Sequence, residues 1–163
     1  MILSTTGQTV AVPVPLAEAY RCEFGDYGRA WVAALPTLAD DCLKRWRLRL
    51  DGPATHGAVA LVLPVRRADD APAVLKLQPV DEETCGEPIA LRAWDGDGAV
   101  RLLEHDPGSG AMLLESLDAQ RPLSSLAETA AVEILSHLLA RLSARPAPAG
   151  LRRLGDVAAR LLQ

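Results

Sequence analysis

The sequence predicts an α+β fold: a five-stranded antiparallel sheet with one helix packed on it, flanked by helices. Between residues 46 and 115, short apolar segments of strand character, the first with a clear two-residue alternation, are joined by turns and interrupted by one helical stretch. Before and after this region they follow the period of helices. The chain has 163 residues, which fit one medium domain or two very small ones, and 49% of them are hydrophobic, too many for wholesale disorder.

Composition excludes several classes of protein. The net charge is -4, so a broad nucleic-acid surface is not expected. No apolar run reaches the roughly 18–20 residues that span a bilayer, and Met1–Gly7 lacks the features of a signal peptide. Cys22, Cys42 and Cys85 lie far apart and fit no close-spaced metal motif. We therefore expect a cytoplasmic protein with no membrane partner and no metal site of its own.

The helical region before the sheet is expected to hold three pieces, 15–22, 27–35 and 37–43. Pro15 suits a first helical turn, and Pro36 would end the second piece. Strands are predicted over 46–50, 58–65, 73–78, 99–104 and 111–115. The first three form a meander, with turns at 51–57 and 66–72.

A helix is expected between the third and fourth strands, over 81–95. Glu87, Leu91 and Trp94 would share one face. Pro88 is tolerated only in a first turn, so the regular helix would begin near Glu87. After the sheet, helices are predicted over 126–144 and 151–162, with a Pro-rich linker at 145–150.

Lys76 is one of only two lysines and lies within an apolar strand. Alternation places it on a face with Val74 and Gln78, where a charge needs a partner or a ligand. Glu87 is the candidate partner, and Glu83, one helical turn earlier, is the rival. A surface lysine and a solvated glutamate are the alternatives.

The order of elements is that of the small lobe of a protein-kinase-like fold. There, a strand lysine holds nucleotide phosphates and pairs with a helix glutamate. The stretch from Glu87 to Val100, Glu-x-x-Ala-Leu-Arg-x-Trp-x-Gly-x-Gly-Ala-Val, is more specific. With Ala-Val-Leu-Lys-Leu at 73–77 and Leu-Leu-Glu at 113–115, it resembles the aminoglycoside/hydroxyurea antibiotic-resistance kinase family, over residues 20 to 125.

The resemblance implies a role for each matching residue. Lys76 would bind the α- and β-phosphates of ATP, and Glu87 would hold Lys76 in place. The segment from Asp51 to Gly57 would cover the phosphates, although Gly52 and Gly57 match a glycine-rich loop only partly; His56 would touch phosphate or remain solvated. The resemblance also places the hinge that bonds adenine at Glu115, Ser116 and Leu117, and adenine-pocket residues at Met112 and Leu114.

The family's second lobe carries a His-Gly-Asp-x-x-x-x-Asn loop and a later metal-binding Asp, and this sequence contains neither. The resemblance therefore implies no catalytic residue in this chain, and Mg²⁺ only with the missing lobe. It divides the chain into a helical segment (1–45), a kinase-like small lobe (46–117), and the hinge with the first helices of a truncated large lobe (118–163).

The expected function is that of the ATP-binding lobe of a phosphotransferase acting on a hydroxyl of an aminoglycoside such as streptomycin, with this chain alone inactive. Its partners would be a nucleotide and, in the full-length protein, the antibiotic. The alternatives are a non-catalytic kinase-like interaction module and an unrelated acidic α+β domain. An uncovered apolar surface near Leu117, Leu123, Leu126 and Leu135 would favour self-association.

Overall fold

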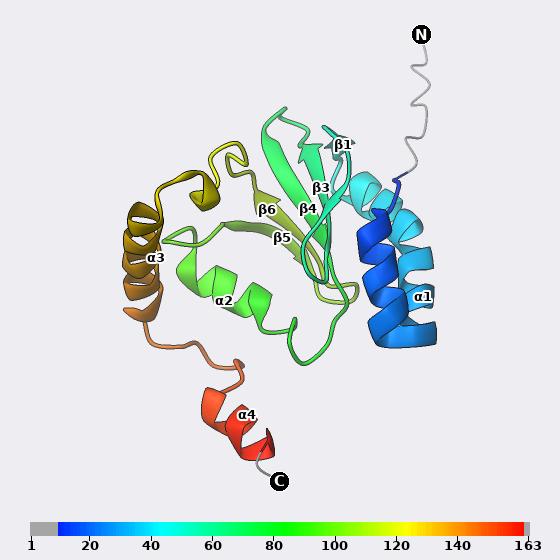
Figure 1. Cartoon of the computed structure of the whole chain (residues 1–163). Coiled ribbons are helices and arrows are strands. Elements are labelled where there is room, and N and C mark those ends of the chain that lie inside the picture. Colours follow the sequence, from blue (N-terminus) through cyan, green and yellow to red (C-terminus); the bar gives the residue numbers. More distant parts are fainter. Residues whose placement is uncertain (1–9, 162–163) are drawn as a thin grey trace. The chain divides into compact units, whose positions relative to one another are not determined.

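The computed structural model describes residues 10–161, so Met1–Gly7 and residue 162, on which expectations were stated, lie outside it. Along the chain the elements are α1 (Val14–Arg45), β1 (Arg49–Leu50), β2 (Thr55–His56), β3 (Leu61–Arg66), β4 (Pro72–Leu77), α2 (Glu87–Trp94), β5 (Leu102–Asp106), β6 (Ala111–Glu115), the 3-10 turn η1 (Leu123–Ser125), α3 (Glu128–Ser143) and α4 (Leu154–Leu161) (Figure 1). The α+β class is confirmed, in an order compatible with a kinase-like small lobe.

The chain forms two compact units. The first takes in the residues up to Pro79 together with Glu104–Leu114, and the second takes in Val80–Leu103 together with the residues from Glu115 onward. The sheet has the strand order β1-β3-β4-β6-β5, with β2 also paired to β3. It therefore has six strands, one more than expected, because the segment predicted as a turn at 51–57 contains β2.

Helix α1 consists of two helical arms, so the break expected between the first and second of the three predicted pieces is confirmed, whereas the second and third pieces form a single arm. The bend is at Gly25, whose φ of 53° and ψ of -124° are open to glycine but strained for other residues. The helix continues through Pro36, beyond which Ala39 and Cys42 are buried. Leu35, on the other side of the proline, is buried as well. The helix is therefore held by core packing on both sides of Pro36, which explains why the proline does not end it.

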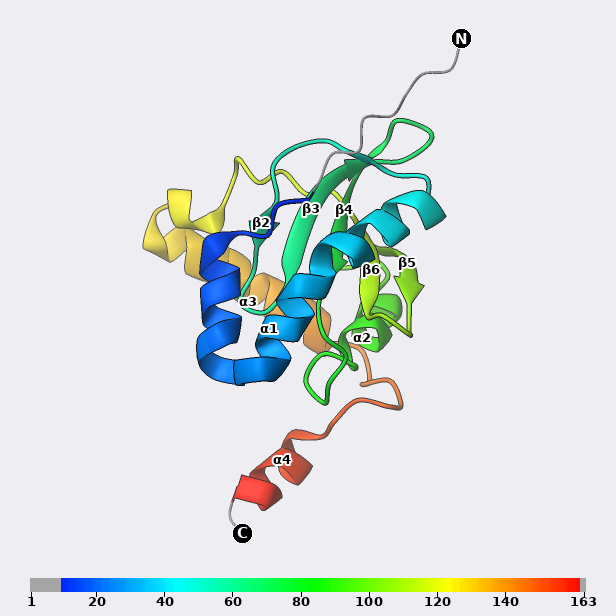
Figure 2. The ribbon, with the colours of Figure 1, turned by 90° about the vertical axis from the view of Figure 1, so that its right-hand side faces the viewer.

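The core of the first unit lies between α1 and one face of the sheet. Figure 2 shows α1 lying across β3 and β4. Residues alternate between buried and half-buried along both strands, as a sheet covered on one face requires. The Tyr20 hydroxyl donates a hydrogen bond of 2.7 Å to the Val59 carbonyl, and the Tyr20 ring stacks on Trp31 with centroids 4.4 Å apart.

The edge of the sheet departs from the predicted hairpin. Arg49–Leu50 pairs with Val65–Arg66, and Thr55–His56 pairs with Leu61–Val62, so β1 and β2 follow the same side of β3. The residues between them form a bulge around Pro53, which lacks the N–H that a ladder needs. The hairpin turn itself lies at Gly57–Ala60, closed by a 2.9 Å bond from the Gly57 amide to the Ala60 carbonyl.

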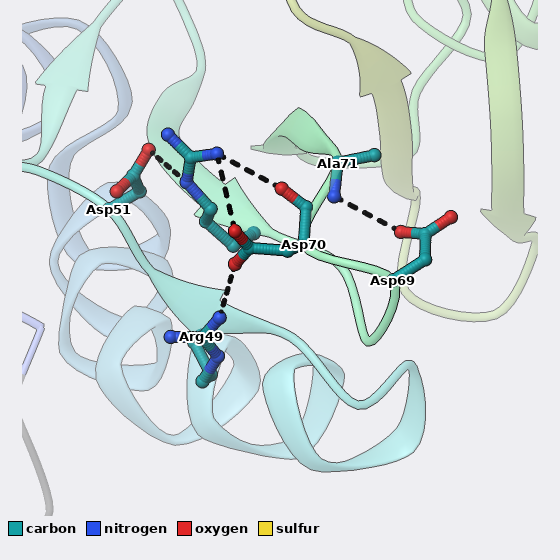
Figure 3. Close-up of polar contacts among 6 residues, drawn as sticks. Arg49, Asp51, Asp69, Asp70 and Ala71 are labelled. Carbon is teal, nitrogen blue, oxygen red and sulfur yellow. Dashed lines mark hydrogen bonds and ion pairs between the residues drawn. The ribbon is translucent and has the colours of Figure 1, made fainter.

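Charged side chains fasten this edge to the β3–β4 turn (Figure 3). Arg66 donates from Nε to the Asp51 carboxylate and from Nη1 to the Asp70 carbonyl, each at 3.0 Å. Arg49 donates to the Asp70 carboxylate at 2.6 Å. Asp70 has a φ of 66°, a left-handed conformation that aspartate tolerates in turns. The predicted turn at 66–72 is thus present, braced by the edge strand.

Several element ends differ from expectation. The first strand begins at Arg49 instead of residue 46, because Trp46 closes α1 through a bond from its amide to the Cys42 carbonyl. The fourth strand is displaced to Leu102–Asp106. Helix α2 does begin at Glu87, and the fifth strand is found as predicted. Among the described residues, no helix has the length and apolar character needed to cross a membrane.

Asp106 is expected to make the first unit sensitive to acid. The Ser109 hydroxyl (2.7 Å) and the Gly108 amide (3.2 Å) donate to its carboxylate, as does Arg45 at 2.7 Å, and these contacts lower its pKa. A carboxyl with a lowered folded-state pKa stabilises the fold above its unfolded pKa, and this contribution is lost as the pH falls through the folded value. Asp106→Asn should cost about 1–2 kcal/mol at pH 7, and the difference should shrink below about pH 4.

Urea unfolding of both proteins between pH 7 and pH 3 measures this effect. Asp26→Asn is the matched control, since the Asp26 side chain is 95% exposed and pairs with Arg29, three residues later in α1. A stability difference for Asp106→Asn that stays constant down to pH 3 would contradict the prediction.

The three cysteines are all free thiols in different settings. Cys22, in the first unit, and Cys85, in the second, are exposed, whereas Cys42 is buried. Burial raises the pKa of the Cys42 thiol to about 11. Among residues 10–161, no group of three or more His, Cys, Asp or Glu side chains is placed to hold a metal ion.

Candidate functional site

Lys76 lies on the sheet face opposite the core, as the alternation predicted. On β4, Ala73, Leu75 and Leu77 are buried, while Val74 and Lys76 are half-buried. The cross-strand partners of the latter two are Pro64 and Val62, which are also half-buried. Lys76 therefore projects from an apolar face on which an ammonium group is costly without an anionic partner.

The register of the sheet adds Thr55 to the site, a residue that the sequence analysis missed. Thr55 pairs with Val62, and Val62 pairs with Lys76. Residues directly opposite each other in antiparallel strands point to the same face. Thr55 thus shares the face of Lys76 two strands away, about 10 Å from it at the usual strand spacing. The position of Thr55 on this face follows only from the pairing of β2 with β3, because the bulge between β1 and β2 breaks the alternation along the edge of the sheet.

The remaining residues of the expected phosphate loop occupy different places. Gly52 lies in the bulge, where it lines a groove of about 700 Å³ with Leu50, Pro53, Leu63 and the segment 10–14. Gly57 lies at the hairpin turn, with open space around it. His56 pairs with Leu61, on the face opposite Lys76, and is exposed. This register favours the solvated alternative for His56 over a phosphate contact.

Glu87 is the first residue of α2, in the second unit, and is half-buried. It lines a cavity of about 630 Å³ within that unit, together with Glu83, the rival candidate, and with Leu91, Trp94 and Leu151. Preceding it, the Asp81 carboxylate accepts bonds from the amides of Glu83 and Thr84 at 2.8 and 2.9 Å. Partial desolvation, which raises the pKa of Asp81, is outweighed by these bonds, so the pKa is lowered.

The hinge expected at residues 115–117 begins at the end of β6. The Glu115 amide donates to the Arg101 carbonyl at 3.0 Å, and the Glu115 carboxylate accepts from the Arg101 amide at 2.7 Å. The Glu115 amide is therefore already engaged within the second unit. Ser116 and Leu117 are exposed. Met112 and Leu114, expected around the adenine, are 0% and 7% exposed.

The apolar surface predicted for the C-terminal part of the chain is present in the second unit. Leu117, Leu126 and Leu135 are exposed, and Leu123 is half-buried. Helix α3 buries none of its residues, and Val132, Ile134, Leu135 and Leu139 are exposed along it. Isolated exposed apolar residues are ordinary, whereas α3 exposes four of them along one helix.

Comparison with known proteins gives a consistent result. A model of the family described as aminoglycoside/hydroxyurea antibiotic resistance kinase matches residues 45–163. A streptomycin 6-kinase of Streptomyces glaucescens is 51% identical over 160 residues, which are 98% of this chain and 52% of that protein. A hydroxyurea phosphotransferase of Kitasatospora aureofaciens is 53% identical over 163 residues, which are 98% of this chain and 48% of that protein.

A streptomycin 6-kinase of Streptomyces griseus is 49% identical over 155 residues, covering 94% of this chain and 50% of that protein. The chain therefore spans about half the length of the curated relatives that it matches. No solved structure matches it.

Proposed function

This chain belongs to the aminoglycoside/hydroxyurea antibiotic resistance kinase family, and from that premise we propose that it is the ATP-binding part of a phosphotransferase. The enzyme would transfer the γ-phosphoryl group of ATP to a hydroxyl of a small antibiotic. The relatives are named for streptomycin and hydroxyurea, and we propose an aminoglycoside such as streptomycin as the acceptor. The observation that carries the proposal is Lys76, half-buried on an apolar sheet face outside the core.

In this proposal each residue has a distinct task. Lys76 holds the α- and β-phosphates of ATP, and Glu87 keeps the Lys76 ammonium in place. Residues 115–117 bond adenine through their backbone groups, while Met112 and Leu114 line the adenine pocket. Gly52 and Gly57 belong to the segment over the phosphates, and we add Thr55, whose hydroxyl shares the Lys76 face.

The chemistry at the acceptor needs groups that this sequence does not contain. No His-Gly-Asp-x-x-x-x-Asn stretch occurs in the 163 residues. We therefore propose that the base for the acceptor hydroxyl and the ligands of Mg²⁺ belong to the part of the relatives that this chain does not span. The chain alone is expected to bind ATP without transferring phosphate. ATP use and three free thiols support a cytoplasmic setting.

An acyl-phosphate derivative of ATP tests the nucleotide site, because the chain has only two lysines, Lys44 and Lys76. A lysine amine beside the phosphates attacks the acyl carbon, forms an amide and releases ATP. Peptide mass spectrometry should show rapid labelling of Lys76 that excess ATP suppresses. Lys44 is the internal control, since its side chain is 72% exposed and lies on α1. Equal labelling of both lysines, without protection by ATP, would favour the alternative, a non-catalytic kinase-like interaction module.

We also propose that the exposed apolar residues of α3 support self-association. Sedimentation velocity should show a mass that rises with concentration for the wild-type chain and stays monomeric for Leu135→Glu with Leu139→Glu. The control is Glu133→Gln, which alters an exposed polar residue of the same helix. A wild-type chain that remains monomeric at high concentration would contradict this part of the proposal.

A further inference from the structure

The segment Trp94–Gly98 of the second unit holds the C-terminal ends of two helices together. The Trp94 indole Nε1 donates a 3.2 Å hydrogen bond to the carbonyl of Leu142, in the last turn of α3. In return, Arg145, just beyond α3, donates from Nη1 to the carbonyl of Ala93 at 2.9 Å, in the last turn of α2. The last four carbonyls of a helix lack partners within it. Each helix end therefore receives a donor from the other.

Asp97 joins the C-terminal ends of α2 and α3 through two ion pairs. Its carboxylate accepts from Arg141 Nε through Oδ1, and from Arg145 Nη2 through Oδ2 at 2.9 Å. The Asp97 side chain is 32% exposed, less than either arginine. A single surface ion pair contributes little, but one carboxylate shared by two arginines forms a network. Arg141 in the last turn of α3 also interacts favourably with the helix dipole.

The same geometry accounts for the glycines of the Trp-x-Gly-x-Gly stretch, which the nucleotide-binding roles leave unexplained. Gly96 and Gly98 have φ values of 81° and 86°, a region that favours glycine. A Cβ on Gly98 would lie 3.3 Å from side-chain carbons of both Arg141 and Leu142. The stretch is therefore a tight loop that α3 approaches closely.

Helix α2 depends on such contacts for its order. It has eight residues, of which only Pro88 and Leu91 are buried. Helices this short are marginal in isolation. Glu87 lies at the opposite end of α2 from Trp94, about 10 Å along the helix axis. A change in how the C-terminal end is held therefore changes the direction in which Glu87 is presented.

We propose that Asp97 is a positioning residue that fixes α2, and with it Glu87, by joining α2 to α3 through Arg141 and Arg145. This inference rests on the proposed function, because the role of Glu87 toward Lys76 belongs to it. Asp97 acts through the helix and touches no nucleotide. Loss of its charge should loosen α2 and weaken nucleotide binding through Glu87 alone.

Hydrogen exchange of the 163-residue chain tests the first half of the inference. Asp97→Asn should speed exchange of the amides at 89–94 by about 5-fold or more, leaving β3 and β4 unchanged. Asp95→Asn is the matched control: Asp95 lies in the same loop, is 77% exposed and approaches Arg101 at 3.5 Å rather than α3. Unchanged exchange in α2 of Asp97→Asn would overturn the inference.

A double-mutant cycle, read with a fluorescent ATP analogue, tests the second half. Asp97→Asn should raise the Kd about 3- to 10-fold in the wild-type background and leave it unchanged in a Glu87→Gln background. Equal weakening in both backgrounds would show general loosening and overturn the positioning role. A wild-type chain that binds no nucleotide would overturn the proposed function, and this role with it. Wild-type binding that Asp97→Asn leaves intact would overturn the positioning role alone.

Discussion

Gly28→Ala should destabilise the first unit by about 3 kcal/mol, at the upper end of the usual cost of overpacking. Gly28 is buried in the second arm of α1, which follows the bend at Gly25. A Cβ on Gly28 would lie 2.1 Å from the carbonyl oxygen of Tyr20 and 2.8 Å from its carbonyl carbon. Both atoms are backbone, so a rotamer change cannot relieve the contact. The contact can be relieved only if the arm of α1 that carries Tyr20 moves away from the arm that carries Gly28.

Separation of the arms is opposed by the contacts of Tyr20. Its ring stacks on Trp31, and its hydroxyl bonds the Val59 carbonyl in the β2–β3 turn. Movement of the first arm away from Gly28 would therefore disturb the sheet as well as the helix. The cost of Gly28→Ala includes lost packing in addition to the steric contact itself.

Thermal and urea unfolding followed by far-UV circular dichroism measure this loss. The Tm should fall by roughly 10 °C. Gly57→Ala is the control, because Gly57 belongs to the same unit and a Cβ there meets nothing within 4 Å; its effect should stay within about 0.5 kcal/mol. Equal stability of the two variants would show that the arms of α1 are not held as close as described.

Lys76→Met should weaken ATP binding between about 10- and 100-fold, the range expected for loss of one charge-assisted hydrogen bond. Methionine keeps the length of the side chain and removes the ammonium. Its apolar character suits a face on which Val62 and Val74 flank the position. The loss should therefore appear in nucleotide affinity while the variant remains folded.

Isothermal titration calorimetry with ATP measures the affinity, and the Tm of each variant checks the fold. Lys44→Met is the matched control: it changes the other lysine of the chain, which is exposed and paired with Asp40. Lys76→Arg should bind more weakly than wild type, because a guanidinium keeps the charge but not the geometry of an ammonium. Unchanged affinity in Lys76→Met would remove Lys76 from the proposed site.

The face of Lys76 could be predicted from sequence because alternation along a strand depends only on local geometry. The start of α2 at Glu87 was equally accessible, since Pro88 restricts what precedes it. The place of Thr55 could not be predicted from sequence, because it depends on how β2 pairs with β3. Asp-Gly-Pro at 51–53 has the composition of a hairpin turn, and only pairing with a second strand distinguishes a turn from a bulge.

The continuation of α1 through Pro36 was inaccessible for a related reason. Pro36 gave a strong local signal for a helix end, whereas the long-range burial of Leu35, Ala39 and Cys42 maintains the helix. Gly28 gave no signal at all, because its importance arises from a backbone eight residues away. The role of Asp97 likewise depends on arginines more than forty residues later in the chain.

The placement of the three thiols makes the unaltered chain suitable for spectroscopic distance measurement. Cys42 is buried, with a pKa raised to about 11, so maleimide dyes should spare it near neutral pH. The two accessible thiols, Cys22 and Cys85, belong to different compact units. A donor and an acceptor fluorophore on this pair would report by energy transfer whether the distance between the two labelled positions changes when ATP is added, without any engineered cysteine.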